Sequence, residues 1–186
     1  MLLSQQGGDN MQLTLTAKLK ILPSEEQETL FLKTMYAWKD ACNDVSAYIA
    51  NAHVLNHKAL NDALYRDLRA RFDLPSQMAQ SVLRMVAAKY KAILTKQKEW
   101  IQPTFKKPEV DLVWNRDYSI NKGLFSVNTL QGRTKVAFVT AGIEEFFDGT
   151  WRFGTAKLLT KHGKWFLHIA VTKRFRPWIL LLYPMS

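Results

Sequence analysis

Lysine and arginine alternate with aromatic residues at several places in the sequence, and this mixture is suited to binding nucleic acid. The clearest runs are Phe105-Lys106-Lys107, Trp114-Asn115-Arg116, Trp151-Arg152-Phe153 and Lys161-His162-Gly163-Lys164-Trp165. Cationic groups can hold phosphates, and exposed aromatic rings can stack on unpaired bases. The alternative is that the rings face inward from strands while the cations only solvate the opposite face.

A second basic pattern consists of Arg84, Lys91 and Lys98, which are spaced by seven residues. On one helix this spacing drifts only slightly around the axis, so it predicts a basic ridge along which a phosphate backbone could lie. The candidate nucleic-acid-binding residues are therefore Arg84, Lys91, Lys98, Lys106, Lys107, Arg116, Arg133, Lys135, Lys161 and Lys164.

Histidine and cysteine offer weaker candidates for chemistry. His53 and His57 are four residues apart, a spacing that can bind a metal on a helix, but the sequence places no carboxylate or cysteine pair with them. Cys42 falls on an apolar stripe without a local basic partner to activate its thiol. We expect the histidines to be polar residues at a helix end and the thiol to be buried and unreactive.

Carboxylates could support catalysis, because metal-dependent cleavage of phosphodiesters needs several of them around the metal ion. Glu144, Glu145 and Asp148 cluster in a predicted loop, where a solvated surface is the simpler interpretation, and no acidic residue follows Asp148. No glycine falls in a phosphate-cradling pattern. The sequence therefore predicts a chain that is not an enzyme, without catalytic residues, a metal or a cofactor.

Composition favours a polyanionic partner, since 26 Lys and Arg against 16 Asp and Glu leave a net charge of +10 over 186 residues. Nucleic acid is the first candidate, and an anionic membrane surface is the competitor. A single cysteine excludes an internal disulfide framework and fits a reducing compartment, so a cytoplasmic protein is expected. The apolar run Trp178–Tyr183 is far shorter than the roughly 20 residues of a spanning helix, which argues against a membrane partner.

The first half of the chain reads as a strand followed by helices. Residues 12–22 alternate between apolar and polar side chains, which is typical of a half-buried strand. Ser24 then predicts a helix start, with Gln27 completing a capping box, and an apolar stripe continues to about Ala52.

A second helix is predicted at about 58–72, and a third, capped by Ser76, should reach about Trp100. Six short strands follow at about 109–114, 117–121, 124–129, 134–140, 151–160 and 164–172. This order predicts an α+β fold, a small antiparallel β-barrel with an insert of about three helices after its first strand.

The predicted boundaries follow from these elements. Residues 11–22 and 103–173 form the barrel, residues 23–102 form the helical insert, and residues 1–10 are expected to be a flexible leader.

The order of motifs resembles the N-terminal region of the TnpB family, transposon-encoded RNA-guided endonucleases related to type V CRISPR effectors. The resemblance covers residues 12–172. It is carried by Leu22–Gln27 (LPSEEQ), Asn43, Leu74–Arg84 (LPSQMAQSVLR), Pro103–Lys106 (PTFK), Gly132-Arg133 and Gly163–His168 (GKWFLH).

This resemblance implies that a wedge-like barrel and a helical recognition insert together bind guide RNA and its heteroduplex with target DNA. It also implies a RuvC-like nuclease domain after a segment such as Lys164–Thr172, where residues 174–186 instead read as an aberrant tail. The expected protein is thus the nucleic-acid-binding front part of a TnpB-like protein without its nuclease. Two alternatives stay open: half of a split RNA-guided endonuclease whose RuvC part is a separate chain, and a decayed transposase remnant.

Overall fold

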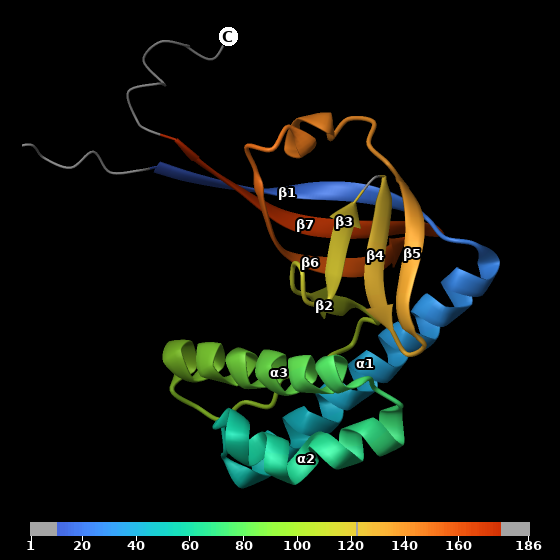
Figure 1. Ribbon diagram of the computed structural model, residues 1–186. Helices are drawn as coiled ribbons and strands as arrows, with labels where there is room; N and C mark the ends of the chain where they lie inside the picture. Colours follow the sequence, from blue (N-terminus) through green and yellow to red (C-terminus); the bar gives the residue numbers. More distant parts are fainter. Residues whose placement is uncertain (1–10, 122, 176–186) are drawn as a thin grey trace, which may run out of the picture.

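A long first helix connects a β-barrel to a layer of helices in the computed structural model (Figure 1). The structure describes residues 11–121 and 123–175, so the predictions for residues 1–10 and 176–186 lie outside the described residues. The elements are β1 (Met11–Leu22), α1 (Glu25–Ala52), α2 (His57–Phe72), α3 (Ser76–Gln97), β2 (Val110–Leu112), β3 (Tyr118–Asn121), β4 (Leu124–Thr129), β5 (Gly132–Val139), the 3₁₀ helix η1 (Glu144–Phe147), β6 (Arg152–Lys161) and β7 (Lys164–Phe175).

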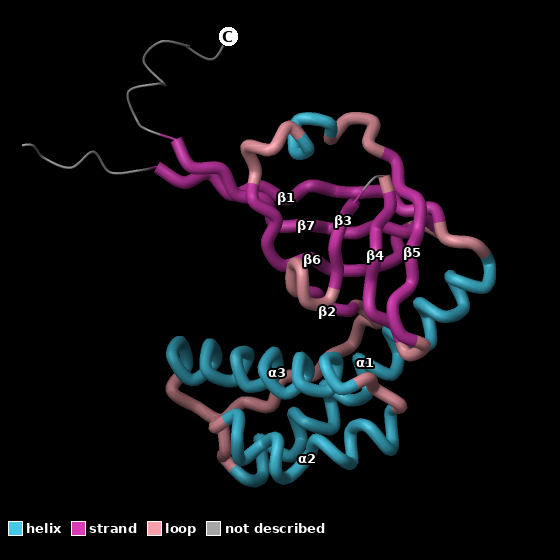
Figure 2. The backbone as a smooth tube through the Cα atoms, in the orientation of Figure 1, coloured by secondary structure: helices cyan, strands magenta, loops and turns pink. Residues whose placement is uncertain are grey.

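The strands of the described chain form one antiparallel sheet in the order β2-β6-β7-β1-β5-β4-β3, which curls into a nearly closed barrel (Figure 2). Strand β1 pairs with β7 from Met11 through Ile21 and with β5 from Lys20 through Leu22. The predicted α+β class is therefore confirmed, as is the pairing of the first strand with strands from the second half of the chain.

Helix α1 begins as the sequence predicts. The Ser24 hydroxyl accepts a hydrogen bond from the Gln27 N–H at 3.3 Å, and the Gln27 side chain accepts one from the Ser24 N–H at 3.1 Å. The other side-chain group of Gln27 donates to the Lys135 carbonyl on β5 at 2.9 Å. Gln27 thus completes the capping box at the N-terminus of α1 and also links this helix to the barrel.

The 28 residues of α1 span about 42 Å, enough to serve both parts of the fold. Near its start, Phe31 meets Trp165 of β7 edge to face, with ring centroids 5.5 Å apart. Further along, the Tyr90 hydroxyl of α3 donates to the Ser46 carbonyl at 2.7 Å. The buried residues of barrel and helices form one continuous core, which holds the two parts together.

The end of α3 differs from the prediction. The helix stops at Gln97, because Lys98 adopts the left-handed conformation (φ 57°) and donates its N–H to the Leu94 carbonyl. The chain then turns back, and Trp100 stacks on His53 with ring centroids 4.4 Å apart. The residues after Gln97 thus pack back toward the end of α1 and do not extend the helix.

Two smaller predictions also need correction. Ser76 does not cap α3: Pro75 occupies that position, and the Ser76 hydroxyl accepts a hydrogen bond from the Tyr65 hydroxyl. Strand β7 continues to Phe175, so the barrel extends past the predicted boundary at residue 173.

Candidate nucleic-acid interface

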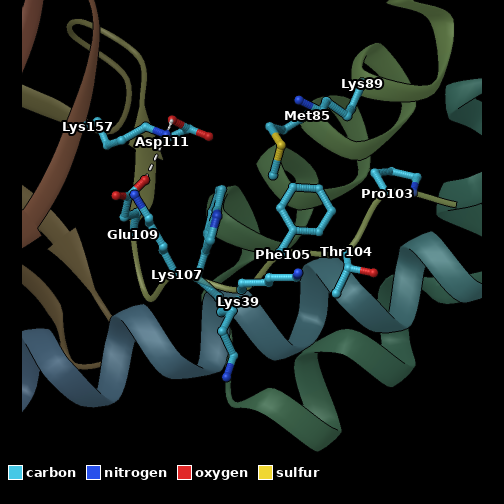
Figure 3. Close-up of a pocket in the computed structure, with 12 residues that line it drawn as sticks. Lys39, Met85, Lys89, Pro103, Thr104, Phe105, Lys107, Glu109, Asp111 and Lys157 are labelled. Carbon is cyan, nitrogen blue, oxygen red and sulfur yellow. Dashed lines mark hydrogen bonds and ion pairs between the residues drawn. The ribbon is translucent and has the colours of Figure 1, made fainter. Parts of the chain in front are cut away.

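A cleft lies between the helical insert and the barrel. It consists of two adjoining hollows of about 340 and 420 Å³ that share Trp38, Met85 and Asp111 as lining residues. Met85 and Lys89 face it from α3, and Asp111 faces it from the barrel side (Figure 3). We call these two hollows the inter-lobe cleft.

The segment 103–107, which leads from the helices to the barrel, is held in place by α1. The Asn43 amide donates to the Phe105 carbonyl at 3.0 Å and accepts from the Phe105 N–H at 2.8 Å. The Ser46 hydroxyl donates to the Pro103 carbonyl at 2.7 Å. Asn43, a part of the TnpB resemblance, therefore has a structural role here: it fixes the backbone that lines the cleft.

The first hollow is lined by more cations than anions, namely by Lys39, Lys89, Lys106, Lys107, Lys157, Glu109 and Asp111. The Lys157 ammonium lies 3.0 Å from the Glu109 carboxylate and 3.6 Å from that of Asp111 (Figure 3). Lys39 lies 3.1 Å from the carboxylate of Asp40.

Three lysines of this hollow have no counter-charge within the part of the chain that the structure describes. Lys89, Lys106 and Lys107 are exposed, and among the described residues no carboxylate lies within 4.0 Å of their ammonium groups. They come from two separate chain segments, α3 and the 103–107 connection. An anion in the cleft would therefore meet positive charge from two sides.

The second hollow contains Arg84 and Arg116. Arg84 is exposed, whereas the Arg116 guanidinium lies 2.8 Å from the Asp117 carboxylate and donates to the Ser81 hydroxyl of α3 at 2.7 Å. Asp117 is only 2% exposed, so the pair is an internal link between α3 and the turn that precedes β3. This geometry gives Arg116 a bridging role.

The basic ridge predicted from Arg84, Lys91 and Lys98 is shorter in the structure than their seven-residue spacing implied. Lys91 is exposed on the helix, but Lys98 lies beyond its end in a left-handed conformation, so it does not continue the same line. Neither residue lines the inter-lobe cleft.

The remaining predicted residues lie on the outside of the barrel. Arg133 donates to the hydroxyls of Ser126 at 2.9 Å and Ser119 at 3.3 Å, and Lys135 lines a shallow hollow of about 260 Å³ beside the same serines. Lys161 and Lys164 lie opposite each other across the two-residue turn between β6 and β7.

Most aromatic rings of the basic runs point inward, as the alternative interpretation held. Trp165 is 5% exposed, Trp114 packs on Phe153 at 4.9 Å, and Trp151 packs on Phe146 at 5.1 Å. Phe105 is half-buried at the cleft. The cations of the sequence runs thus lie near the surface, while the neighbouring rings are buried in the core (Trp165) or are partly buried and packed against it.

The sequence patterns did not single out Lys39, Lys89 or Lys157, which also line the first hollow. Lys89 could have been added to the candidate residues, because it follows Met85 by one turn on an exposed side of α3. The sequence did not show which side of that helix faces the barrel. No signal singles out Lys39, whose place in the cleft depends on the docking of α1.

Within the described residues, no group of three or more His, Cys, Asp or Glu side chains is placed to hold a metal ion. His53 stacks on Trp100, and His57 begins α2, both at helix ends as predicted. Burial, and to a lesser degree the charge of Asp111, raises the pKa of the Cys42 thiol well above its usual value. This agrees with a buried, unreactive thiol.

The acidic segment after β5 contains a short 3₁₀ helix, where the sequence predicted a loop. Glu144 lies in it and accepts a hydrogen bond from the Gly142 N–H at 2.9 Å. The Asp148 carboxylate accepts from the Thr150 hydroxyl and N–H at 2.6 and 2.7 Å, and these bonds lower its pKa. Both carboxylates thus stabilise local turns.

Comparison with known protein families and with curated proteins finds no match to the sequence. None of the helices that the structure describes is both long and apolar enough to cross a membrane.

Proposed function

We propose that the protein binds nucleic acid through the inter-lobe cleft. The observation that carries this proposal is the convergence of Lys89, Lys106 and Lys107, which have no carboxylate partner among the described residues. Neutralising phosphates with such lysines releases condensed counterions, which supplies most of the affinity in sequence-independent binding. An overall charge of +10 adds to the attraction at longer range.

The kind of nucleic acid that we propose is the one the TnpB resemblance implies, guide RNA and its heteroduplex with target DNA. The order of a first strand, three helices and a barrel supports this proposal, because it is the architecture that the resemblance implies. In this proposal the chain binds nucleic acid and does not cut it. Metal-dependent cleavage by highly purified protein, lost on mutation of Glu144, Glu145 or Asp148, would overturn that part.

The test is the salt dependence of binding to labelled RNA and to an RNA–DNA heteroduplex, measured by fluorescence anisotropy. The triple variant Lys89→Gln, Lys106→Gln and Lys107→Gln removes the three lysines of the cleft. Each lost phosphate contact lowers the slope of log K against log salt by about 0.7–0.9, so we expect a decrease of about 2–3.

A matched control removes the same charge elsewhere. Lys33, Arg66 and Lys96 are exposed, have no carboxylate within 4.0 Å among the described residues and do not line the cleft, so their triple glutamine variant should keep the slope close to that of the original protein. Equal losses in the two triple variants would refute the cleft as the binding site and leave only general attraction by net charge.

A further inference from the structure

The outer face of three neighbouring barrel strands carries a second group of cations. Side chains alternate between the core and the outside along each strand, and on β1 Ala17, Leu19 and Ile21 are the buried ones. The residues between them point outward, and the same holds for β6 and β7. Outward-facing on these strands are Lys18, Lys20, Lys157, Leu159, Lys161, Lys164, Phe166 and His168. We call this set the outer cationic face.

Strand register arranges these residues in rows. Lys18, His168 and Lys157 form one row, and Lys20, Phe166 and Leu159 form the next. Lys164 and Lys161 form a third row at the β6–β7 turn. Strands lie about 4.8 Å apart, and alternate residues of one strand about 6.7 Å apart, so the face measures about 10 Å by 13 Å. It is large enough for a few nucleotides.

Little negative charge balances this face. Among the described residues, the carboxylates in contact with its lysines are Glu109 and Asp111, and both bind Lys157 at its edge. Lys161 faces Lys164 directly across the hairpin, and like charges in such pairs destabilise a sheet. A bound polyanion would remove this repulsion.

An aromatic ring lies in the middle of these cations. Phe166 is half-buried on the outside of β7, beside Lys20 of β1, and its ring centroid is 6.2 Å from that of His168. A partly accessible ring beside lysine side chains is the arrangement on which single-stranded nucleic acids stack their bases. Bases inside a duplex cannot reach such a ring, because they are already stacked on one another.

From this arrangement we propose that the outer cationic face binds single-stranded nucleic acid, with an unpaired base stacked on Phe166 and phosphates on Lys20, Lys161 and Lys164. The face is distinct from the inter-lobe cleft, although Lys157 borders both. Binding at the outer cationic face can therefore be tested independently of binding in the cleft.

The test compares two probes on two variants: a short single-stranded oligonucleotide, and the same oligonucleotide with abasic sites. Stacking contributes enough that Phe166→Leu should weaken binding of the first probe about 5- to 140-fold. Phe166→Tyr keeps the ring and should bind like the original protein. On the abasic probe, Phe166→Leu and the original protein should bind equally well, since no base remains to stack.

The cations are tested separately by Lys20→Gln combined with Lys164→Gln, which does not depend on how Phe166→Leu folds. This variant should lower the salt slope for both probes by about 1.4, while Lys33→Gln with Lys96→Gln should not. Unchanged binding in both Phe166→Leu and the lysine variant would overturn the proposal. So would binding of anionic phospholipid vesicles, but not of the oligonucleotide, that depends on the same residues.

Failure of this inference is distinguishable from failure of the proposed function. The cleft variant Lys89→Gln, Lys106→Gln and Lys107→Gln keeps every residue of the outer cationic face, including Lys157 at the shared border. If Phe166→Leu changes binding of the single strand and the cleft variant changes nothing, the face is supported and the cleft is refuted.

Discussion

Replacing Asn43 by alanine tests how the segment lining the cleft is held. Asn43 is half-buried on α1, and its amide makes both hydrogen bonds to the backbone of Phe105, which is 62 residues away in the sequence. The alanine variant removes the two bonds together and leaves the Phe105 N–H and carbonyl without these partners.

The expected loss follows from these bonds. Each intramolecular hydrogen bond contributes about 0.5–1.5 kcal/mol net, so two of them give about 1–3 kcal/mol. Alanine is the better helix former by up to about 0.7 kcal/mol, which offsets part of this loss. The free energy of unfolding should therefore fall by roughly 0.3–2.3 kcal/mol when the full propensity gain is subtracted.

The assay is urea unfolding followed by circular dichroism, with Asn51→Ala as the control. Asn51 is exposed near the end of the same helix, so this control reports the propensity change without the two bonds. Because Lys106 and Lys107 directly follow Phe105, the Asn43 variant should also bind RNA more weakly under conditions where it is fully folded.

An unfolding free energy of Asn43→Ala equal to that of Asn51→Ala would refute the reasoning. It would mean that water replaces both partners at no cost. Reduced stability with unchanged RNA affinity would refute only the link between the anchored segment and the cleft.

Three further outcomes are expected. Arg116→Ala leaves the carboxylate of Asp117, which is 2% exposed, without its cation, and should lower the unfolding free energy by about 2–4 kcal/mol in urea titrations; a loss below about 0.5 kcal/mol would contradict the bridging role. Burial, followed by the charge of Lys18, lowers the pKa of His168 in the folded protein. The neutral imidazole therefore contributes stability that is present above the unfolded pKa of about 6.5 and is lost as the pH falls from there through the folded pKa. The urea midpoint should thus fall less between pH 8 and about pH 5 in His168→Gln than in the original protein, and equal decreases would count against this explanation. Cys42, which is 0% exposed, should react with a thiol reagent only in denaturant, and rapid labelling of the native protein would show that α1 opens locally.

Much of the fold could be predicted from the sequence, because the signals that define single elements are local. The capping box of Ser24 and Gln27 marks the start of α1, and both side chains act within one turn. His162 and Gly163 both have positive φ values, 49° and 69°, and form the two-residue turn that joins β6 to β7. In each case the physical cause lies within a few residues, so the sequence alone determined the element.

The candidate sites depend on contacts between distant segments, which local patterns do not encode. The sequence indicates that the lysines of α3 are exposed. Only the docking of α3 against the barrel decides that Lys89 lines the cleft and Lys91 does not. In the same way, only the register of β1 with β7 sets Phe166 beside Lys20. Burial of large apolar side chains determines these placements. The hydrophobic effect is non-directional and scales with the apolar area removed from water, so it acts on whole faces of helices and strands and leaves no local signal in the sequence. The sequence by itself thus determined the elements and the excess of positive charge, while the tertiary structure decided which of those charges converge.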